Sequence, residues 1–221
     1  MGELDSVMQR LSAEAARGDM PVDEAVYAEA GRPVTDPVLL GSGSLSSRVG
    51  IFGRDPGRQE IHLGEPFIGA GGRLVRDVLH ERRFGGKAPD VEAARRAGQP
   101  LFWGNTVPFK PLGNKAWSMK VKRRFSPLIA EVLVHHWQGD QLITLGNVAF
   151  DWFRIEDRSV QPALRAHWAL PDRYERSVTI SFLGKPITLH PLPHPSPLNA
   201  RWYPRFPALL HARLEALGWP S

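Results

Sequence analysis

A histidine near the carboxyl end of the chain stands where it could donate or accept a proton. His194 follows a β-like run at 186–190, and its loop contains Pro193, Pro195 and Pro197. Because proline fixes the φ angle, this loop should keep its shape before any ligand arrives. A Pro-rich surface turn that happens to carry a histidine would contain the same residues. This segment alone therefore leaves both interpretations open.

A carboxylate holds a similar position near the first predicted strand. The run 48–53 has the pattern of a strand, and Asp55 follows it in a tight turn between Arg54 and Pro56. A carboxylate there could orient a water molecule or balance a developing positive charge. Aspartate is also common in turns for structural reasons alone. Asp55 is therefore a catalytic candidate whose role depends on what else lies beside it.

A glycine-rich segment, 64–74, leads into a predicted helix at 70–83. Glycines let a ligand approach the backbone, and a helix N-terminus favours negative charge. Loop flexibility would explain the glycines equally well. The spacings of the dinucleotide fingerprint and of the phosphate-binding P-loop are absent.

Two more landmarks complete the set. Asn105 lies near the end of an apolar strand at 101–107, and 142–149 reads as a core strand followed by a helix. In parallel sheets, ligands lie beyond the carboxyl ends of the strands. We therefore expect Asp55, Asn105 and His194 to lie at one edge of the sheet.

Taken in chain order, the Asp55 turn with the segment 64–74, the Asn105 strand, the run 142–149 and the His194 loop resemble the uracil-DNA glycosylase superfamily. The resemblance spans Val49 to Leu217. The segment 64–74 is similar to the iron–sulfur branch, whereas Asp55-Pro56 and the loop 194–198 are similar to the main, cluster-free branch. The chain contains no cysteine, which departs from the iron–sulfur branch because its cluster is bound by cysteine thiolates. We expect no metal and no cofactor.

The resemblance implies a role for each landmark. Asp55 would position a water molecule and balance the charge on the sugar, and His194 would donate to the uracil O2. Asn105 would bind the O4/N3 edge, Phe67 would stack on the base, and Gly53 belongs to the same base-binding set. Asn105 could instead cap a strand, and Phe67 could simply pack in the core.

One position bears on specificity. The main branch has a tyrosine directly after the proline of the Asp-Pro turn, where its ring blocks the thymine methyl group, but this chain has Gly57. Glu60 matches an acidic position of the iron–sulfur branch near the C5 edge of the base. We expect it to contact substrate, although a solvated surface glutamate would explain it as well.

The resemblance also outlines a DNA-binding face. Leu198 matches the wedge that fills the space left by a flipped base, and such apolar wedges unstack DNA. Ser196, Arg201 and the turn 69–72 could hold phosphates.

A basic run lies between the Asn105 strand and the next predicted helix, and we expect Lys122, Arg123 and Arg124 in it to contact DNA. Such a run is more often a solvated face. A divergent branch of the superfamily has a similar loop that ends in a histidine bonded covalently to the abasic sugar. Here Phe125 and Ser126 follow instead, so we expect no permanent crosslink.

The composition fits a DNA-binding enzyme without requiring one. The 221 residues carry 28 Lys and Arg against 23 Asp and Glu, a net charge of +5 with a pI near 9.9. A modest basic excess suits a polyanionic partner but is common. No apolar run is long enough to cross a membrane, and the acidic N-terminus is unlike a signal peptide. We expect the protein to be a monomer. We expect its location to be cytoplasmic, of the bacterial intracellular type, and associated with the nucleoid.

Alternating strands and helices predict an α/β fold, a single-domain three-layer α/β/α sandwich whose central, mostly parallel sheet has about four strands. We expect one domain over 1–221, with an N-terminal helix and connector at 1–47 and a core at 48–217. The other expected elements are an amphipathic helix around Leu4–Leu11, a short helix within 84–99, a helix beginning at Ser126-Pro127, a strand at 141–146, a hairpin of 177–182 with 186–190, and a last helix from Pro204 to Leu217.

The expected function is that of a monofunctional uracil-DNA glycosylase. It would flip uracil out of single- or double-stranded DNA, use water as the nucleophile and leave an abasic site. The first alternative is a non-catalytic or product-retaining protein that binds abasic or damaged DNA. A small-nucleotide hydrolase on a similar scaffold is disfavoured by Leu198 and by the basic charge balance.

Overall fold

The computed structural model describes residues 4–220, and within them the chain forms one five-stranded sheet with the order β2-β1-β3-β5-β4. The strands are β1 (Val49–Gly53), β2 (Phe102–Asn105), β3 (Gln141–Leu145), β4 (Val178–Phe182) and β5 (Lys185–Leu192). The first four in sheet order are parallel, and β4 is antiparallel to β5. The α/β prediction is confirmed. The sheet has five strands rather than about four because both strands of the last hairpin join it.

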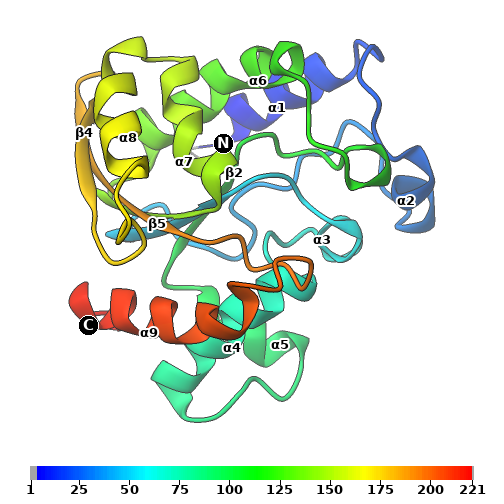
Figure 1. Ribbon diagram of the computed structural model, residues 1–221. Coiled ribbons are helices and arrows are strands. Elements are labelled where there is room, and N and C mark those ends of the chain that lie inside the picture. Colours follow the sequence, from blue (N-terminus) through cyan, green and yellow to red (C-terminus); the bar gives the residue numbers. More distant parts are fainter. Residues whose placement is uncertain (1–3, 221) are drawn as a thin grey trace.

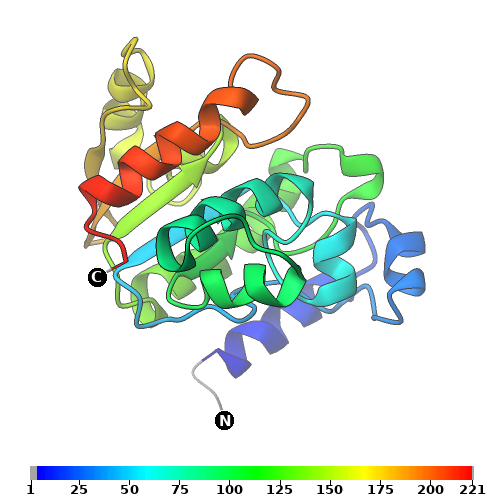
Figure 2. The same ribbon diagram turned by 90° about the horizontal axis from the view of Figure 1, so that it is seen from below.

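Helices cover both faces of the sheet (Figure 1). One face is covered by α4 (Ala70–Phe84), α5 (Val91–Gly98) and α9 (Phe206–Ala216), which lie towards the viewer in Figure 2. The other face is covered by α1 (Asp5–Ala15), α6 (Met119–Glu131), α7 (Asn147–Phe150) and α8 (Gln161–Trp168).

Two apolar clusters correspond to these two faces. Successive side chains of a strand point to opposite faces, and β1 shows this directly. Phe52 packs with the cluster under α1, α6 and α8, whereas Ile51 packs with the cluster under α4 and α9. Both side chains are fully buried. The sheet is therefore buried on both sides, as parallel sheets usually are.

Two short helices lie beside the segments that follow the strands. These are α2 (Glu24–Glu29) and α3 (Arg58–Leu63), which pack together through Tyr27 and Ile61. The predicted connector 31–47 contains no helix or strand. The N-terminal stripe does form a helix, α1, which buries Val7 and Leu11. The sequence did not predict α2 or α3.

The start of α6 corrects one prediction. The helix begins at Met119, where the Ser118 hydroxyl accepts a hydrogen bond from the Val121 N–H at 3.3 Å. Ser126 and Pro127 therefore lie inside the helix instead of opening it. Proline cannot donate to the carbonyl one turn earlier, that of Arg123, and the Ser126 hydroxyl donates to that carbonyl instead, at 3.4 Å. The expectation was wrong because the same Ser-Pro pair suits a helix start and, with this bond, a helix interior.

The C-terminal elements agree with the sequence. β4 and β5 form the expected hairpin around Gly184. A single 3₁₀ turn, Tyr203–Arg205, precedes α9, and Gly218 follows it with a φ angle of 66°. The helix within 84–99 is α5, capped by the Asp90 carboxylate.

Candidate functional site

The parallel strands bring the predicted site residues to one edge of the sheet. Gly53 and Asn105 are direct partners at the carboxyl ends of β1 and β2. The loops that carry Asp55 and His194 follow β1 and β5. The tip of the β5 loop reaches the N-terminus of α4, where a Cβ on Gly71 would lie only 2.6 Å from the Pro195 carbonyl oxygen. The loops after β1 and β5 therefore meet around the start of α4.

Phe67, Gly53 and Asn105 form one platform. A Cβ on Gly53 would lie 2.5 Å from two ring carbons of Phe67 and 3.8 Å from the Asn105 side-chain oxygen. Only a residue without a side chain leaves room for the ring at this strand end. The ring also packs against Trp103, with centroids 5.3 Å apart. The structure thus brings together three residues that the sequence assigned to base binding.

Asn105 has an unused donor. The residue is 2% exposed, and its side-chain Nδ2 has no hydrogen-bond partner among the residues described. A buried polar group without a partner is uncommon and costs free energy. An amide offers a donor and an acceptor together, so Asn105 is suited to read the edge of a bound base.

A buried arginine holds the loop that carries Phe67. Arg76 on α4 is 0% exposed and donates to the Phe67 carbonyl at 2.8 Å, to the Pro66 carbonyl at 2.7 Å and to the Glu65 carboxylate at 2.6 Å. Phe67 itself has a φ angle of 55°, in the left-handed region that non-glycine residues rarely adopt. A Cβ on Gly72 would lie 2.1 Å from the Phe67 carbonyl carbon, so the helix start also requires glycine.

Sequence reasoning did not identify Arg76. The available signal was a charged residue within the apolar face of a helix, between Val75 and Val78. Such a residue is buried only when it is paired. The carboxylate that pairs with it, on Glu65, also accepts hydrogen bonds from the Ser42 backbone and hydroxyl, at 2.9 and 2.8 Å.

Glu60 is buried and both of its oxygens contact backbone. It accepts hydrogen bonds from the Gly57 N–H at 2.9 Å and from the Gly69 N–H at 3.0 Å. It therefore ties the Asp55 turn to the start of α4. A Cβ on Gly57 would lie 2.6 Å from a Glu60 oxygen, so a tyrosine at position 57 would displace this carboxylate.

Asp55 is a nearly inaccessible carboxylate with one free oxygen. Its side chain is 1% exposed, and Oδ2 accepts from the Arg54 Nε–H at 2.8 Å. Oδ1 has no partner among the described residues. Burial raises the pKa of Asp55 to about 6, although the positive charges of Arg54, Lys122 and Lys110 oppose this shift.

His194 lies in the loop after β5, and its backbone carbonyl accepts hydrogen bonds that stabilise this loop. That carbonyl accepts from the Ser196 N–H at 2.9 Å and from the Asn199 side-chain amide at 3.2 Å. A Cβ on Gly146 would meet the His194 Cβ at 3.1 Å. The residue remains exposed overall, yet the neighbouring protein atoms desolvate its imidazole and lower its pKa, and the Arg54 charge adds to this effect.

Arg54 connects the two catalytic candidates, a role that sequence reasoning left open. Its charge acts on both the Asp55 carboxylate and the His194 imidazole. Its guanidinium also donates to the Asn114 carbonyl at 3.1 Å. Asp55 and His194 are therefore on the same side of the molecule, within the electrostatic range of one arginine.

The predicted DNA-binding residues fall into two groups. Ser196, Leu198 and Arg201 lie in the loop between β5 and α9, and Leu198 is 95% exposed. Such an exposed leucine at the tip of a loop contributes nothing to the core. Its position fits the wedge role that the resemblance implies.

The other group lies on the first turns of α6, not in a loop before it. Lys122 faces the site, because its ammonium interacts with the Asp55 carboxylate. Arg123 is exposed. Arg124 points elsewhere and pairs with Asp19 at 2.5 Å. The structure therefore brings Lys122 to the site but not Arg124.

Within residues 4–220, no group of three or more His, Asp or Glu side chains is arranged to hold a metal ion. The iron–sulfur cluster of one superfamily branch does not fit this chain, which has no cysteine to bind it. Among the described helices, none has both the length and the apolar character needed to cross a bilayer.

Comparisons with known proteins identify the family of this chain. Residues 40–218 match the family model described as the uracil DNA glycosylase superfamily. A segment of 44 residues is 39% identical to the type-4 uracil-DNA glycosylase of Thermotoga maritima, and this match covers 20% of the present chain and 23% of that relative. The family model spans most of the chain, including every site residue named above. The chain therefore belongs to the uracil DNA glycosylase superfamily.

Proposed function

We propose that this protein excises uracil from DNA by hydrolysing the bond between the base and the deoxyribose, leaving an abasic site. One observation carries the proposal. A buried carboxylate with a free oxygen, Asp55, lies two residues beyond Gly53, against which the Phe67 ring and the Asn105 amide converge. Family membership and the segment shared with a type-4 uracil-DNA glycosylase support the same reaction.

The chemistry assigns a task to each group. As the glycosidic bond breaks, positive charge grows on the sugar and negative charge grows on the uracil. The free Oδ1 of Asp55 would accept a hydrogen bond from the attacking water, and its charge would stabilise the sugar cation. At neutral pH the lowered pKa of His194 keeps its imidazole neutral, so one ring N–H can donate to the uracil O2 as charge builds there.

Base recognition follows from the platform. The Phe67 ring would stack on the flipped uracil, and Asn105 would use its free Nδ2 donor and its oxygen on the O4/N3 edge. Glu60 would keep the Asp55 turn and the α4 start in register through its two backbone contacts. We therefore assign it a positioning role.

The first test is excision itself. The purified protein should convert an oligonucleotide with one uracil into a strand that breaks in alkali. We expect Asp55→Asn and His194→Ala each to lose at least about a hundred-fold in single-turnover rate, since each removes a group that acts in the transition state. Asp140→Asn is the matched control, because that carboxylate is 54% exposed and pairs with Arg48 at the start of β3.

If uracil-containing strands stay intact in alkali after treatment with the unaltered protein, the proposed uracil excision is contradicted. Tight binding to an abasic oligonucleotide in the same experiment would then favour a binding protein instead.

A further inference from the structure

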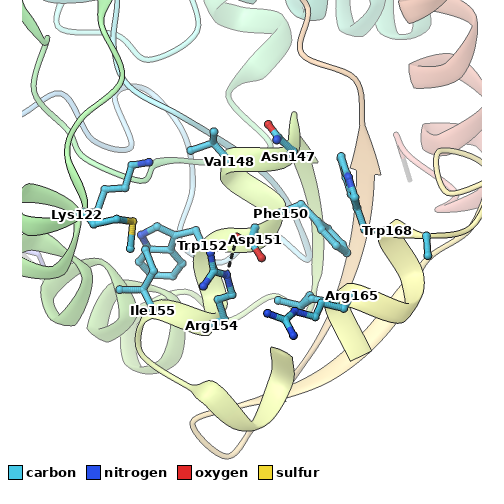
Figure 3. Close-up of a pocket in the computed structure, with 13 residues that line it drawn as sticks. Lys122, Asn147, Val148, Phe150, Asp151, Trp152, Arg154, Ile155, Arg165 and Trp168 are labelled. Carbon is cyan, nitrogen blue, oxygen red and sulfur yellow. Dashed lines mark hydrogen bonds and ion pairs between the residues drawn. The ribbon is translucent and has the colours of Figure 1, made fainter. Parts of the chain in front are cut away.

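A cavity of about 460 Å³ opens beside the proposed site, between α6, α7 and α8 (Figure 3). Its apolar wall includes Phe150 and Trp152, which are buried, and the half-buried Trp168. The Phe150 and Trp168 rings are nearly parallel, with centroids 5.3 Å apart and planes 30° from each other. We call this space the flanking cavity. Its volume lies in the range of sites that bind small organic groups.

The rim of the flanking cavity is positively charged. Lys122, Arg154 and Arg165 line it together with Asp151. Arg154 pairs with Asp151 at 2.6 Å, whereas Lys122 and Arg165 form no salt bridge with any residue of the described chain. An aromatic wall with unpaired cations at its edge suits a base that is attached to a phosphate.

The wall also contains a polar group without a partner. Trp152 is 1% exposed, and its indole Nε1–H makes no hydrogen bond to any described residue. A buried N–H normally has an acceptor.

The flanking cavity lies beside the proposed uracil site. Lys122 lines the cavity and interacts electrostatically with both Asp55 and Asp151. Asn147, at the cavity edge, directly follows Gly146, which packs against His194. A strand that places uracil over Phe67 therefore has an adjacent space for a second base.

We propose that the flanking cavity binds an unpaired base of the DNA strand that carries the uracil. The ligand class is a nucleobase with its phosphate, and the base stacks on the half-buried Trp168 while Arg165 and Lys122 hold the phosphate. The inference rests on the proposed function, because it places this strand relative to Asp55. Neighbouring bases are free in single-stranded DNA but stacked and paired in a duplex. The cavity therefore favours single-stranded substrates.

The first experiment measures binding without chemistry. A fluorescent single-stranded oligothymidylate, which has no uracil, is titrated with the protein. Ala169→Trp fills the cavity from its exposed edge, and Arg165→Glu reverses a rim charge; each should weaken binding about ten-fold, the range of one stacked base. Arg158→Glu makes the same charge change on an exposed residue outside the cavity and should leave affinity unchanged.

The second experiment finds the position of the base. Single-turnover excision is measured on uracil oligonucleotides in which each neighbouring nucleotide in turn lacks its base. We expect one position to lower the rate at subsaturating protein, and we expect Ala169→Trp to remove this dependence. A duplex of the same sequence should be indifferent to the cavity variants.

The outcomes separate the two proposals. Suppose that the enzyme is active, that no missing base lowers its rate, and that both variants bind oligothymidylate as the unaltered protein does. This result would overturn the cavity proposal alone. Equal losses on single strands and duplexes would overturn it as well, in favour of general charge attraction. Cavity-dependent binding without uracil excision would support the cavity and contradict the proposed function.

Discussion

At the scale of single residues, the site contains the Asp55 carboxylate, whose charged form is disfavoured by burial in the folded protein. Asp55 has almost no contact with solvent and only one hydrogen-bonded oxygen. Its pKa, about 6, lies above the ordinary value because burial outweighs the attraction of Arg54. Such a shift is a statement about stability, since the folded chain takes up a proton more readily than the unfolded chain does.

The sign of this effect gives a stability prediction. The contribution of Asp55 to folding is fully present below about pH 4 and is lost as the pH rises through about 6. Because asparagine does not ionise, the Asp55→Asn variant does not lose this stability as the pH rises. The free energy of unfolding of the variant, relative to the unaltered protein, should therefore rise by about 2–3 kcal/mol between about pH 4 and about pH 8. Urea unfolding at both pH values measures it, and a difference that is independent of pH would refute the buried-charge argument.

The same carboxylate sets a pH limit on the reaction. Water positioning requires ionised Asp55, so the single-turnover rate should fall about ten-fold for each pH unit well below about 6. A rate that stays level down to about pH 5, with the fold intact by circular dichroism, would argue against Asp55 as the group that titrates.

At the scale of elements, the site depends on how α4 begins. The loop before this helix holds Phe67 in a left-handed conformation, and Arg76 binds two successive carbonyls of that loop from within the helix. Glu60 on α3 accepts hydrogen bonds from Gly57, in the Asp55 turn, and from Gly69, at the end of the same loop. These contacts fix the aromatic ring over Gly53.

This arrangement predicts a large effect of Arg76→Met. The change leaves the Glu65 carboxylate without its buried cation and frees the backbone carbonyls of Pro66, Phe67, Ala94 and Arg95. We expect a loss of about 3–5 kcal/mol in the free energy of unfolding. Arg96→Met, on the exposed face of α5, is the control and should change stability little. Similar urea midpoints for the two variants would show that the buried network is unimportant.

At the scale of the whole molecule, the carboxyl edge of the sheet gathers the groups that would face DNA. The loop after β5 presents Leu198 to solvent, while Lys122 and the flanking cavity lie on the α6 side. The chain carries a net charge of +5, which favours approach to a polyanion in general. Contact on both sides of the site would let one strand be held while its uracil is turned inward.

Leu198 should affect the rate of excision only from duplex DNA, in which stacked base pairs must be separated. We expect Leu198→Ala to slow excision from a duplex about ten-fold and to leave excision from a single strand almost unchanged, because only the duplex requires a wedge. Leu183→Ala is the control, since that leucine is also exposed, 49%, but lies in the β4–β5 turn. Equal slowing on both substrates would assign Leu198 to general DNA contact.

Local patterns in the sequence were enough to predict the five strands, several of the helices and the residues at the strand ends. Alternating apolar runs and turn residues are local signals, so β1, β2, β3, the last hairpin and α9 could all be predicted. The motifs around Asp55, Asn105 and His194 were sufficient to suggest the superfamily. Local signals failed at Ser126-Pro127, because a proline in a helix is tolerated when another donor replaces its missing N–H.

Which groups come into contact depended on the folding of the whole chain. In the folded chain Glu60 contacts two backbone N–H groups, and Arg76 is buried beneath the Phe67 loop. Lys122 and Arg124 point in different directions from α6. The flanking cavity lies between α6, α7 and α8. The physical reason is that burial and partnership depend on contacts between segments far apart in the chain. A residue type and its neighbours in sequence do not specify those contacts.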